Sequence, residues 1–146
     1  MYENGVYAEI KGGKNYPYIH GTVTFRQETR GVLVTAEING LPRKECGIFA
    51  FHIHSGGSCT GNAEDEFADA QGHYNPDNKP HPCHAGDLPP LFSNNGYAYM
   101  QVLTDRFSVG EIVGKTIIIH SGTDDFKTQP SGDSGNKIAC GVIERV

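Results

Sequence analysis

Large apolar residues alternate with small or polar ones in the stretch FAFHIH, residues 49–54. Successive side chains of a β-strand point to opposite faces, so His52 and His54 are predicted to share one face. Phe49, Phe51 and Ile53 then share the opposite face, which we interpret as the face toward the hydrophobic core. The two histidines are therefore expected to lie outside the core, covered by loops.

Other metal-ligand residues follow this stretch. His73, His81, His84 and Asp87 lie in the polar segment after it, and His120 ends the apolar run TIIIH at residues 116–120. Neutral imidazole is a good ligand for copper and zinc, and a nearby carboxylate suits zinc. A single His-x-His pair is more often a packed or surface feature. The gathering of these residues nevertheless indicates a metal site built from one strand, one long loop and a second strand.

The seventh histidine, His20, falls outside this set. It lies on the polar face of a predicted strand, and we interpret it as exposed to solvent. Alternating patterns predict strands at residues 6–11, 19–26, 31–38, 47–54, 96–103, 115–120 and 137–143. A helical turn is predicted near residues 108–113, and two long polar loops at residues 55–90 and 121–136. Seven or eight short strands predict an all-β antiparallel sandwich or barrel.

The bulk properties limit the classes of function. The length suits a single domain, residues 1–146. The net charge of -5 gives no indication of a basic face for nucleic acid. No apolar run approaches the ~20 residues of a membrane-spanning helix, so no membrane partner is expected. No signal peptide is recognisable, which fits a cytoplasmic protein, or a periplasmic or extracellular one whose leader was removed.

Five short motifs occur in a characteristic order: FHIH at 51–54, GHYNP at 72–76, HAGDL at 84–88, IH at 119–120 and ACGVI at 139–143. Together they resemble the copper, zinc superoxide dismutase family, from about residue 5 to residue 143. The resemblance implies an eight-stranded antiparallel Greek-key β-barrel with two long functional loops, and copper and zinc ions as cofactors. It implies an oxidoreductase that dismutates superoxide to dioxygen and hydrogen peroxide, using a redox-cycling copper bridged through His73 to zinc.

The resemblance also implies a role for each site residue. The copper ligands would be His52, His54, His73 and His120. The zinc ligands would be His73, His81, His84 and Asp87. Asp124 would link His52 to His81, and Cys59 would form a disulfide with Cys140. Lys137 stands where the family usually has an arginine; it keeps the positive charge without the planar fork of donors. His73 and Lys137 are thus the expected catalytic residues, with Lys137 guiding the superoxide anion.

Three departures from the family pattern bear on assembly and chemistry. Only four residues separate His54 from Cys59, in a segment that often supplies dimer contacts in the family. We therefore expect a monomer, or a dimer that differs from the family's usual one. The loop after His120 is short and lacks a run of steering charges. Cys46 and Cys83 have no family counterpart, and the sequence leaves open whether they pair.

Two other functions are alternatives. One is a non-enzymatic copper-binding or copper-delivery protein on the same barrel, which the loss of a copper ligand would favour. The other is a zinc-only structural or hydrolytic protein. A hydrolytic site needs an open, water-bearing position, whereas four protein groups would close this zinc site. Copper content measured together with a superoxide assay separates both from the enzyme.

Overall fold

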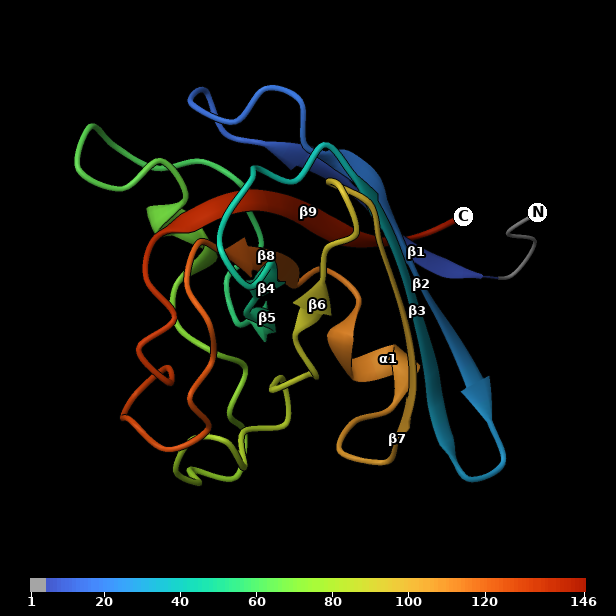
Figure 1. Cartoon of the computed structure of the whole chain (residues 1–146). Coiled ribbons are helices and arrows are strands. Elements are labelled where there is room, and N and C mark those ends of the chain that lie inside the picture. Colours follow the sequence, from blue (N-terminus) through green and yellow to red (C-terminus); the bar gives the residue numbers. More distant parts are fainter. Residues whose placement is uncertain (1–4) are drawn as a thin grey trace.

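The computed structural model describes residues 5–146 and shows a fold made almost entirely of antiparallel strands (Figure 1). The first strands are β1 (Val6–Gly12), β2 (His20–Glu28), β3 (Gly31–Asn39), β4 (Ile48–Phe49) and β5 (Phe51–His54). The later strands are β6 (Leu91–Phe92), β7 (Ala98–Thr104), β8 (Thr116–His120) and β9 (Lys137–Arg145). A 3-10 turn, η1 (Ala68–Ala70), and a short helix, α1 (Val109–Ile112), complete the elements.

The strand order is that of a curled Greek-key sheet. Seven strands are hydrogen-bonded in the order β5-β8-β9-β1-β2-β3-β7, and β4 pairs with β6. After β3 the chain crosses to β5 at the opposite edge of this sheet, and it later returns to β7, which pairs antiparallel with β3. Every strand pairing is antiparallel. The expectation of an antiparallel Greek-key β-barrel or sandwich is confirmed.

The core lies inside the curl and follows the alternation of the strands. Phe49, Phe51 and Ile53 are fully buried in the main cluster, as predicted. Ile118 alternates to the other side of β8, where it pairs with Cys140 and joins a second small cluster. The sheet therefore has apolar side chains on its inner face and, near β8 and β9, a covered patch on its outer face.

Two details of the strands differ from the prediction. The predicted strand at 47–54 is interrupted at Ala50, because its N–H donates to Gly122 and its carbonyl accepts from the His120 N–H. Strand β6 was not predicted, since two residues carry no recognisable alternation. The helical turn is present as α1, where the Glu111 carboxylate accepts a hydrogen bond from the Ser108 N–H.

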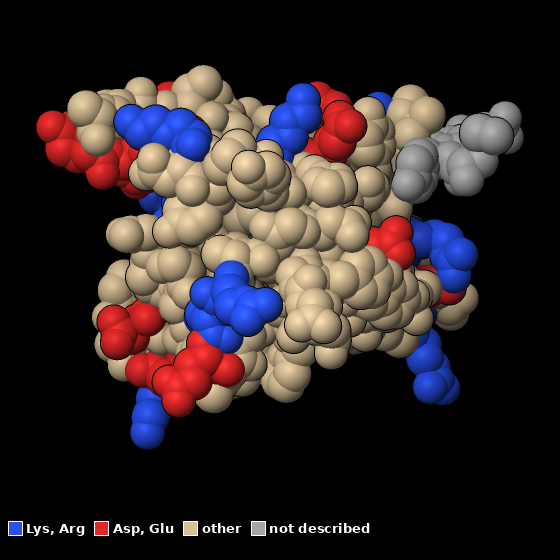
Figure 2. Space-filling model, turned by 45° about the horizontal axis from the view of Figure 1, so that its top comes forward, with Lys and Arg blue, Asp and Glu red and all other residues tan. Residues whose placement is uncertain are grey.

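Two long connections lie beside the outer face of β5 and β8 (Figure 1): residues 55–90 and residues 121–136. His20 is exposed, as expected, and Cys46 and Cys83 are both free and exposed. Figure 2 shows one face on which Lys and Arg lie near Asp and Glu around a broad uncharged area. Across residues 5–146 the structure contains no helix long and apolar enough to cross a membrane.

Candidate metal centre

Strands β5 and β8 place three histidines on the outer face of the sheet. His52 and His54 alternate with core residues along β5, which pairs with β8. His120 ends β8, where a register irregularity separates it from Ile119. The Nε2 atoms of His54 and His120 are 3.2 Å apart. All three rings are buried, although none belongs to the main core cluster.

A fourth histidine reaches these three from the 55–90 loop. His73 forms an isolated antiparallel bridge with His54, which brings its ring to 4.1 Å from the ring of His52, centre to centre. One ligand atom from each residue lies within 4.8 Å of the others in the group His52, His54, His73 and His120. This all-imidazole group could hold a copper ion.

A second group shares His73 with the first. The ligand atoms of His52, His73, His81 and Asp87 also lie within 4.8 Å of one another. The Nδ1 atom of His84 is 3.1 Å from the Nδ1 atom of His73 and 3.3 Å from Asp87 Oδ2. Three histidines and one carboxylate, with His84 as a member, form a set that suits zinc. His52 belongs to both groups by distance, but only its Nδ1 atom is free to bind a metal ion, because its Nε2 atom already has a partner.

That partner is Asp124, which links the two groups from behind. Its Oδ2 atom is 2.8 Å from His52 Nε2, and its Oδ1 atom is 2.8 Å from His81 Nε2. A carboxylate accepts hydrogen bonds only, so each imidazole donates its Nε2 proton to Asp124. This fixes both tautomers and leaves each Nδ1 lone pair facing away from Asp124.

Buried nitrogen atoms without a hydrogen-bond partner indicate whether these residues fit two metal ions. Among the described residues, His52 Nδ1, His73 Nε2 and His81 Nδ1 are buried side-chain atoms without a hydrogen-bond partner. His81 Nδ1 lies 3.0 Å from Asp87 Oδ2, but not in hydrogen-bond geometry. Buried polar atoms are rarely left unsatisfied. Their position among other imidazoles and a carboxylate is what a copper and a zinc ion require.

The local electrostatics keep the ligands in the form that binds metal. Burial lowers the pKa of His52 and of His84, and it lowers that of His54 well below the usual value. Burial, followed by the nearby His52 and His73, lowers the pKa of His120 to about 3. Burial raises the pKa of Asp124, but hydrogen bonds from His52 and His81 outweigh it and lower the pKa overall. Neutral imidazole is the form that binds metal, and the ionised Asp124 carboxylate accepts the hydrogen bonds that hold His52 and His81.

Comparison with known proteins agrees with this geometry. Residues 19–143 match the family model described as copper/zinc superoxide dismutase (SODC). The chain belongs to the copper/zinc superoxide dismutase family. "Superoxide dismutase [Cu-Zn]" of Photobacterium leiognathi is 38% identical over 138 residues, 85% of this chain and 78% of the relative. "Superoxide dismutase [Cu-Zn] 2" of Aquifex aeolicus (strain VF5) is 36% identical over 138 residues, 84% and 78% respectively.

A solved structure of the family has the same fold. The "Cu/Zn superoxide dismutase from Brucella abortus" aligns with a TM-score of 0.80 at 28% sequence identity. The alignment covers 94% of this chain and 98% of that one. The family resemblance inferred from the motifs is thus confirmed.

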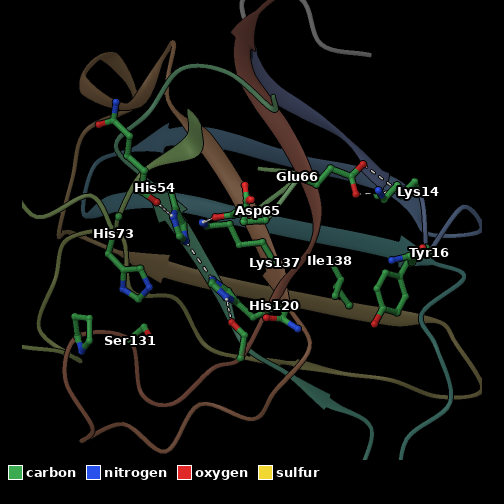
Figure 3. Close-up of a pocket in the computed structure, with 18 of the residues that line it drawn as sticks. Lys14, Tyr16, His54, Asp65, Glu66, His73, His120, Ser131, Lys137 and Ile138 are labelled. Atoms are coloured by element: carbon green, nitrogen blue, oxygen red, sulfur yellow. Dashed lines mark hydrogen bonds and ion pairs between the residues drawn. The ribbon is translucent and has the colours of Figure 1, made fainter. Parts of the chain in front are cut away.

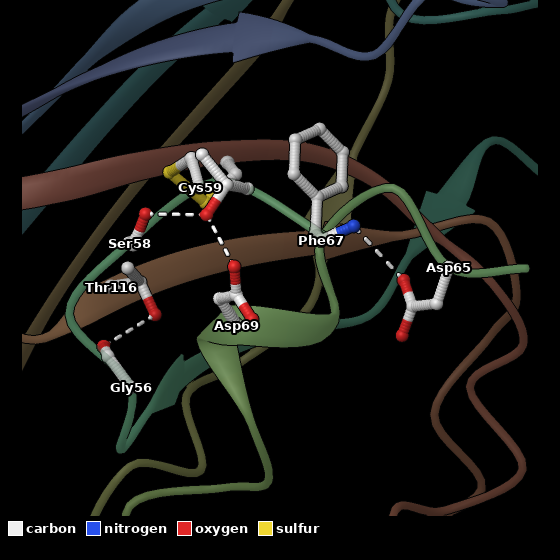
Figure 4. The surroundings of a disulfide bond; sticks show 9 residues. Gly56, Ser58, Cys59, Asp65, Phe67, Asp69 and Thr116 are labelled. Carbon is white, nitrogen blue, oxygen red and sulfur yellow. Dashed lines mark hydrogen bonds between the residues drawn. A yellow bond between two sulfur atoms is a disulfide. The ribbon is translucent and has the colours of Figure 1, made fainter. Parts of the chain in front are cut away.

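The disulfide that the resemblance implied is present in the structure. Cys59 and Cys140 are bonded across 81 residues of sequence (Figure 4). Together with Phe67, Ala70 and Ile118 they form the small cluster outside the barrel. The bond therefore fastens the start of the 55–90 loop to β9, one strand away from His120.

Several contacts that hold the ligands could not be recognised in the sequence. The carbonyl of Gln71 accepts a hydrogen bond from His54 Nδ1 at 2.7 Å, which leaves His54 Nε2 for the metal. The side chain of Gln129 both accepts from the N–H and donates to the carbonyl of His81. Arg106 donates to the carbonyls of Pro82 and His84. Contacts with backbone carbonyls and with single polar side chains are not part of any sequence motif, so they could not be predicted from the sequence.

An open pocket of about 780 Å³ leads to the first ligand group. His54, His73 and His120 are among the residues that line it, and Lys137 lies beside His120 (Figure 3). Lys137 is paired with His120 across β8 and β9, which explains its place next to this ligand. Its Nζ atom is 2.6 Å from Asp65 Oδ2, an ion pair that the sequence did not lead us to expect. The lysine side chain is 18% exposed, so it is not an ordinary solvated surface lysine.

Proposed function

We infer that this protein catalyses the dismutation of superoxide to dioxygen and hydrogen peroxide. Membership of the copper/zinc superoxide dismutase family is the main support for this reaction. The observation in this chain that supports it most is the pair of ligand groups that share His73. A shared imidazole joins a redox-active ion to a second cation, an arrangement that a simple copper carrier or a zinc-only site does not need.

We propose that His52, His54, His73 and His120 hold copper, and that His73, His81, His84 and Asp87 hold zinc. When bound, copper supplies the one-electron couple that both half-reactions need, and zinc supplies a fixed positive charge. His52 contributes Nδ1, because its Nε2 atom is directed to Asp124. His54 contributes Nε2, because its Nδ1 atom donates to the Gln71 carbonyl.

We propose that the Nε2 atom of His73 holds and delivers one of the protons that peroxide formation requires. This atom is buried and has no hydrogen-bond partner within the described chain. Its other nitrogen, Nδ1, lies 2.9 Å from Asp87 Oδ1 on the zinc side. One nitrogen of this ring is therefore without a hydrogen-bond partner, while the second nitrogen is held on the zinc side by Asp87.

Lys137 is proposed to guide the substrate. Superoxide is an anion and the chain carries a net charge of -5, so attraction must come from local positive charge near the site. We expect Lys137→Ala to slow dismutation several-fold to about tenfold, Lys137→Glu to slow it more, and Lys137→Arg to change it little. Stopped-flow rates at several ionic strengths measure this. An unchanged rate and salt dependence in Lys137→Glu would place Lys137 outside the substrate path.

The function itself is tested by metal analysis and activity on the same sample. Protein loaded with copper and zinc should bind one of each per chain and dismutate superoxide far faster than the same concentration of free copper. A fully metallated sample whose rate does not exceed that of free copper would falsify the proposed function.

We also propose that the protein is a monomer, or a dimer unlike the usual one of its family. The support is the short segment between His54 and Cys59, whose backbone is turned inward: the Gly56 N–H donates to Ala70 and its carbonyl accepts from Thr116. Sedimentation velocity at several concentrations tests this. A tight dimer whose interface is built from residues 55–59 would contradict it.

A further inference from the structure

Asp65 occupies the pocket that leads to the proposed copper ligands, and its carboxylate binds Lys137 directly. Lys137 Nζ donates to Asp65 Oδ2 at 2.6 Å, and both residues line the pocket with His54, His73 and His120 (Figure 3). The contact joins the 55–90 loop to β9 across 72 residues of sequence. The lysine proposed to guide an anion toward copper is therefore already paired with an acid of the same chain.

Contacts other than the one with Lys137 hold Asp65 in position. Its Oδ1 atom accepts a hydrogen bond from the Phe67 N–H at 3.0 Å (Figure 4), and its own N–H donates to Asn62 Oδ1. Phe67 is buried in the cluster that contains the disulfide. The carboxylate is therefore held by a tight turn that the Cys59–Cys140 bond fastens to β9.

Lys137 does not depend on Asp65 to reach the site. Its backbone is paired with His120 in the sheet, so the lysine stem starts beside a proposed copper ligand whatever its ammonium group contacts. A paired ammonium and carboxylate have no net charge, and the field of such a dipole falls off faster with distance than the field of a free cation. Lys14 also lines this pocket, together with the acidic residues Glu64 and Glu66.

We propose that Asp65 is a positioning residue that restrains Lys137 and weakens the attraction of the pocket for anions. This inference rests on the proposed function, because it concerns the approach of superoxide to that site. Asp65 makes the guidance by Lys137 weaker than a free lysine would provide. The disulfide-fastened turn that carries Asp65 thereby limits the rate at which the anion enters.

Anion affinity gives a direct test. Azide, titrated into copper- and zinc-loaded protein and followed by the copper absorption spectrum, should bind about fivefold more tightly to Asp65→Asn than to wild type. The dismutation rate of Asp65→Asn should rise and should fall more steeply with added salt. The double variant Asp65→Asn with Lys137→Met should return close to wild-type azide affinity, because the net charge of the pair is again zero.

Glu64→Gln is the matched control. It removes the same charge from the adjacent pocket residue and leaves the Asp65–Lys137 pair intact, so azide affinity should change less than twofold. Equal effects of Asp65→Asn and Glu64→Gln would overturn the inference, because general charge would then explain both. Weaker azide binding in Asp65→Asn would also overturn it, since Asp65 would then be aiming Lys137 productively.

A second readout needs no activity and no copper. In ¹⁵N-lysine-labelled, zinc-loaded protein, the Lys137 ammonium should be protected from proton exchange and give a sharp signal. That signal should broaden in Asp65→Asn and persist in Glu64→Gln. Its absence in wild type would overturn the inference whether or not the enzyme is active. Conversely, lack of dismutase activity in loaded wild type, with the ammonium signal present, would defeat the proposed function alone.

Discussion

Three of the four proposed copper ligands lie on strands, whereas all four proposed zinc ligands lie in one loop. His52 and His54 lie on β5 and His120 ends β8, where paired backbones fix their spacing. The zinc-side residues His81, His84 and Asp87 lie in the 55–90 connection, without a strand to hold them. The copper half is therefore positioned by the sheet, and the zinc half by side-chain contacts and by its own metal.

This difference explains why hydrogen bonds gather on the zinc side. Arg106, Gln129 and Asp124 each bind a segment of the loop that carries the zinc-side ligands. Long loops need such anchors, because ordering them costs conformational entropy that a small apolar contact does not offset. Substitutions in the two halves should consequently have different consequences.

The largest expected effect is the separation of activity from stability by ligand substitutions. His120→Ala should lower the dismutation rate at least about 100-fold while zinc stays bound, because His120 belongs to the copper set alone. Asp87→Ala should instead weaken zinc binding and lower the melting temperature before it affects copper. Metal analysis, rates and melting curves on both variants measure this, with His20→Ala as an exposed histidine control. Loss of copper with zinc retained in Asp87→Ala would reverse the assignment of the two sites.

Asp124 is the place where the two halves meet, so its substitution should couple them. Asp124→Asn keeps the shape but can accept a hydrogen bond from only one of the two imidazoles, and its NH2 group then faces the N–H donor of the other. We expect zinc affinity to fall about 10- to 100-fold, with a smaller loss for copper, which retains its strand-borne ligands. Competition with a chelator measures both.

The neighbouring Asp125→Asn makes the same charge change at an exposed carboxylate that accepts from Lys127 and Thr128 within its own loop. It should leave both metal affinities within about twofold. If Asp125→Asn weakened zinc as much as Asp124→Asn, the effect would be one of general charge and not of the Asp124 bridge.

The disulfide should matter most when no metal orders the loop. A bond that closes a loop of this size stabilises by about 4 to 5 kcal/mol when strain is small. Zinc binding orders part of the same loop, so reduction should lower the melting temperature more in metal-free than in zinc-loaded protein. Scanning calorimetry measures the melting temperatures. The substitutions Cys46→Ser and Cys83→Ser remove the two free cysteines, so the reductant acts only on the Cys59–Cys140 bond. An equal drop in both forms would show that the loop is held by other contacts.

The strand-borne half was the more predictable from sequence. The alternation in residues 49–54 placed His52 and His54 opposite the core, and the run ending at His120 did the same for β8. These predictions succeed because strand periodicity is local. The break at Ala50 was missed because it depends on hydrogen bonds to Gly122 and His120, which are distant in sequence.

The loop-borne half depended on the family motifs. Residues 55–90 have no period from which a geometry could be derived. Residue type alone marked His73, His81, His84 and Asp87 as candidate ligands, but their assignment as the zinc set and the role of Asp124 came from the resemblance. Asp65 was overlooked altogether. Its role depends on a turn and on a lysine 72 residues away, and neither leaves a pattern in the sequence.

In the metal-free protein, the copper-side histidines and the zinc-side carboxylate should affect the free energy of unfolding in different pH ranges. The effect of each residue should be modest. Burial lowers the pKa of His120 to about 3, below the value of about 6.5 in an unfolded chain. Between these values the unfolded state binds a proton that the folded state does not. The free energy of unfolding should therefore decrease as pH falls through this window, by about 1.4 kcal/mol per pH unit for one histidine.

The zinc-side carboxylate acts in a lower window. Burial raises the pKa of Asp87, but the hydrogen bond with His73 outweighs this and lowers the pKa below its usual value. Its contribution is present above about pH 4 and is lost only below that, where the unfolded carboxylate takes up a proton and the folded one stays ionised until its own lower pKa is reached. Between about pH 4.5 and 6 the slope should therefore come from the buried histidines.

Urea unfolding in the presence of a chelator, across pH 4.5 to 7.5, measures this slope. His120→Gln should flatten it by about one proton, because an uncharged amide replaces a group that only the unfolded chain protonates. Asp87→Asn should leave the slope in this range unchanged. The comparison uses slopes, so a general loss of packing in either variant does not affect it. A slope that flattened in Asp87→Asn and not in His120→Gln would mean that the loop, and not the strand-borne histidines, controls acid unfolding.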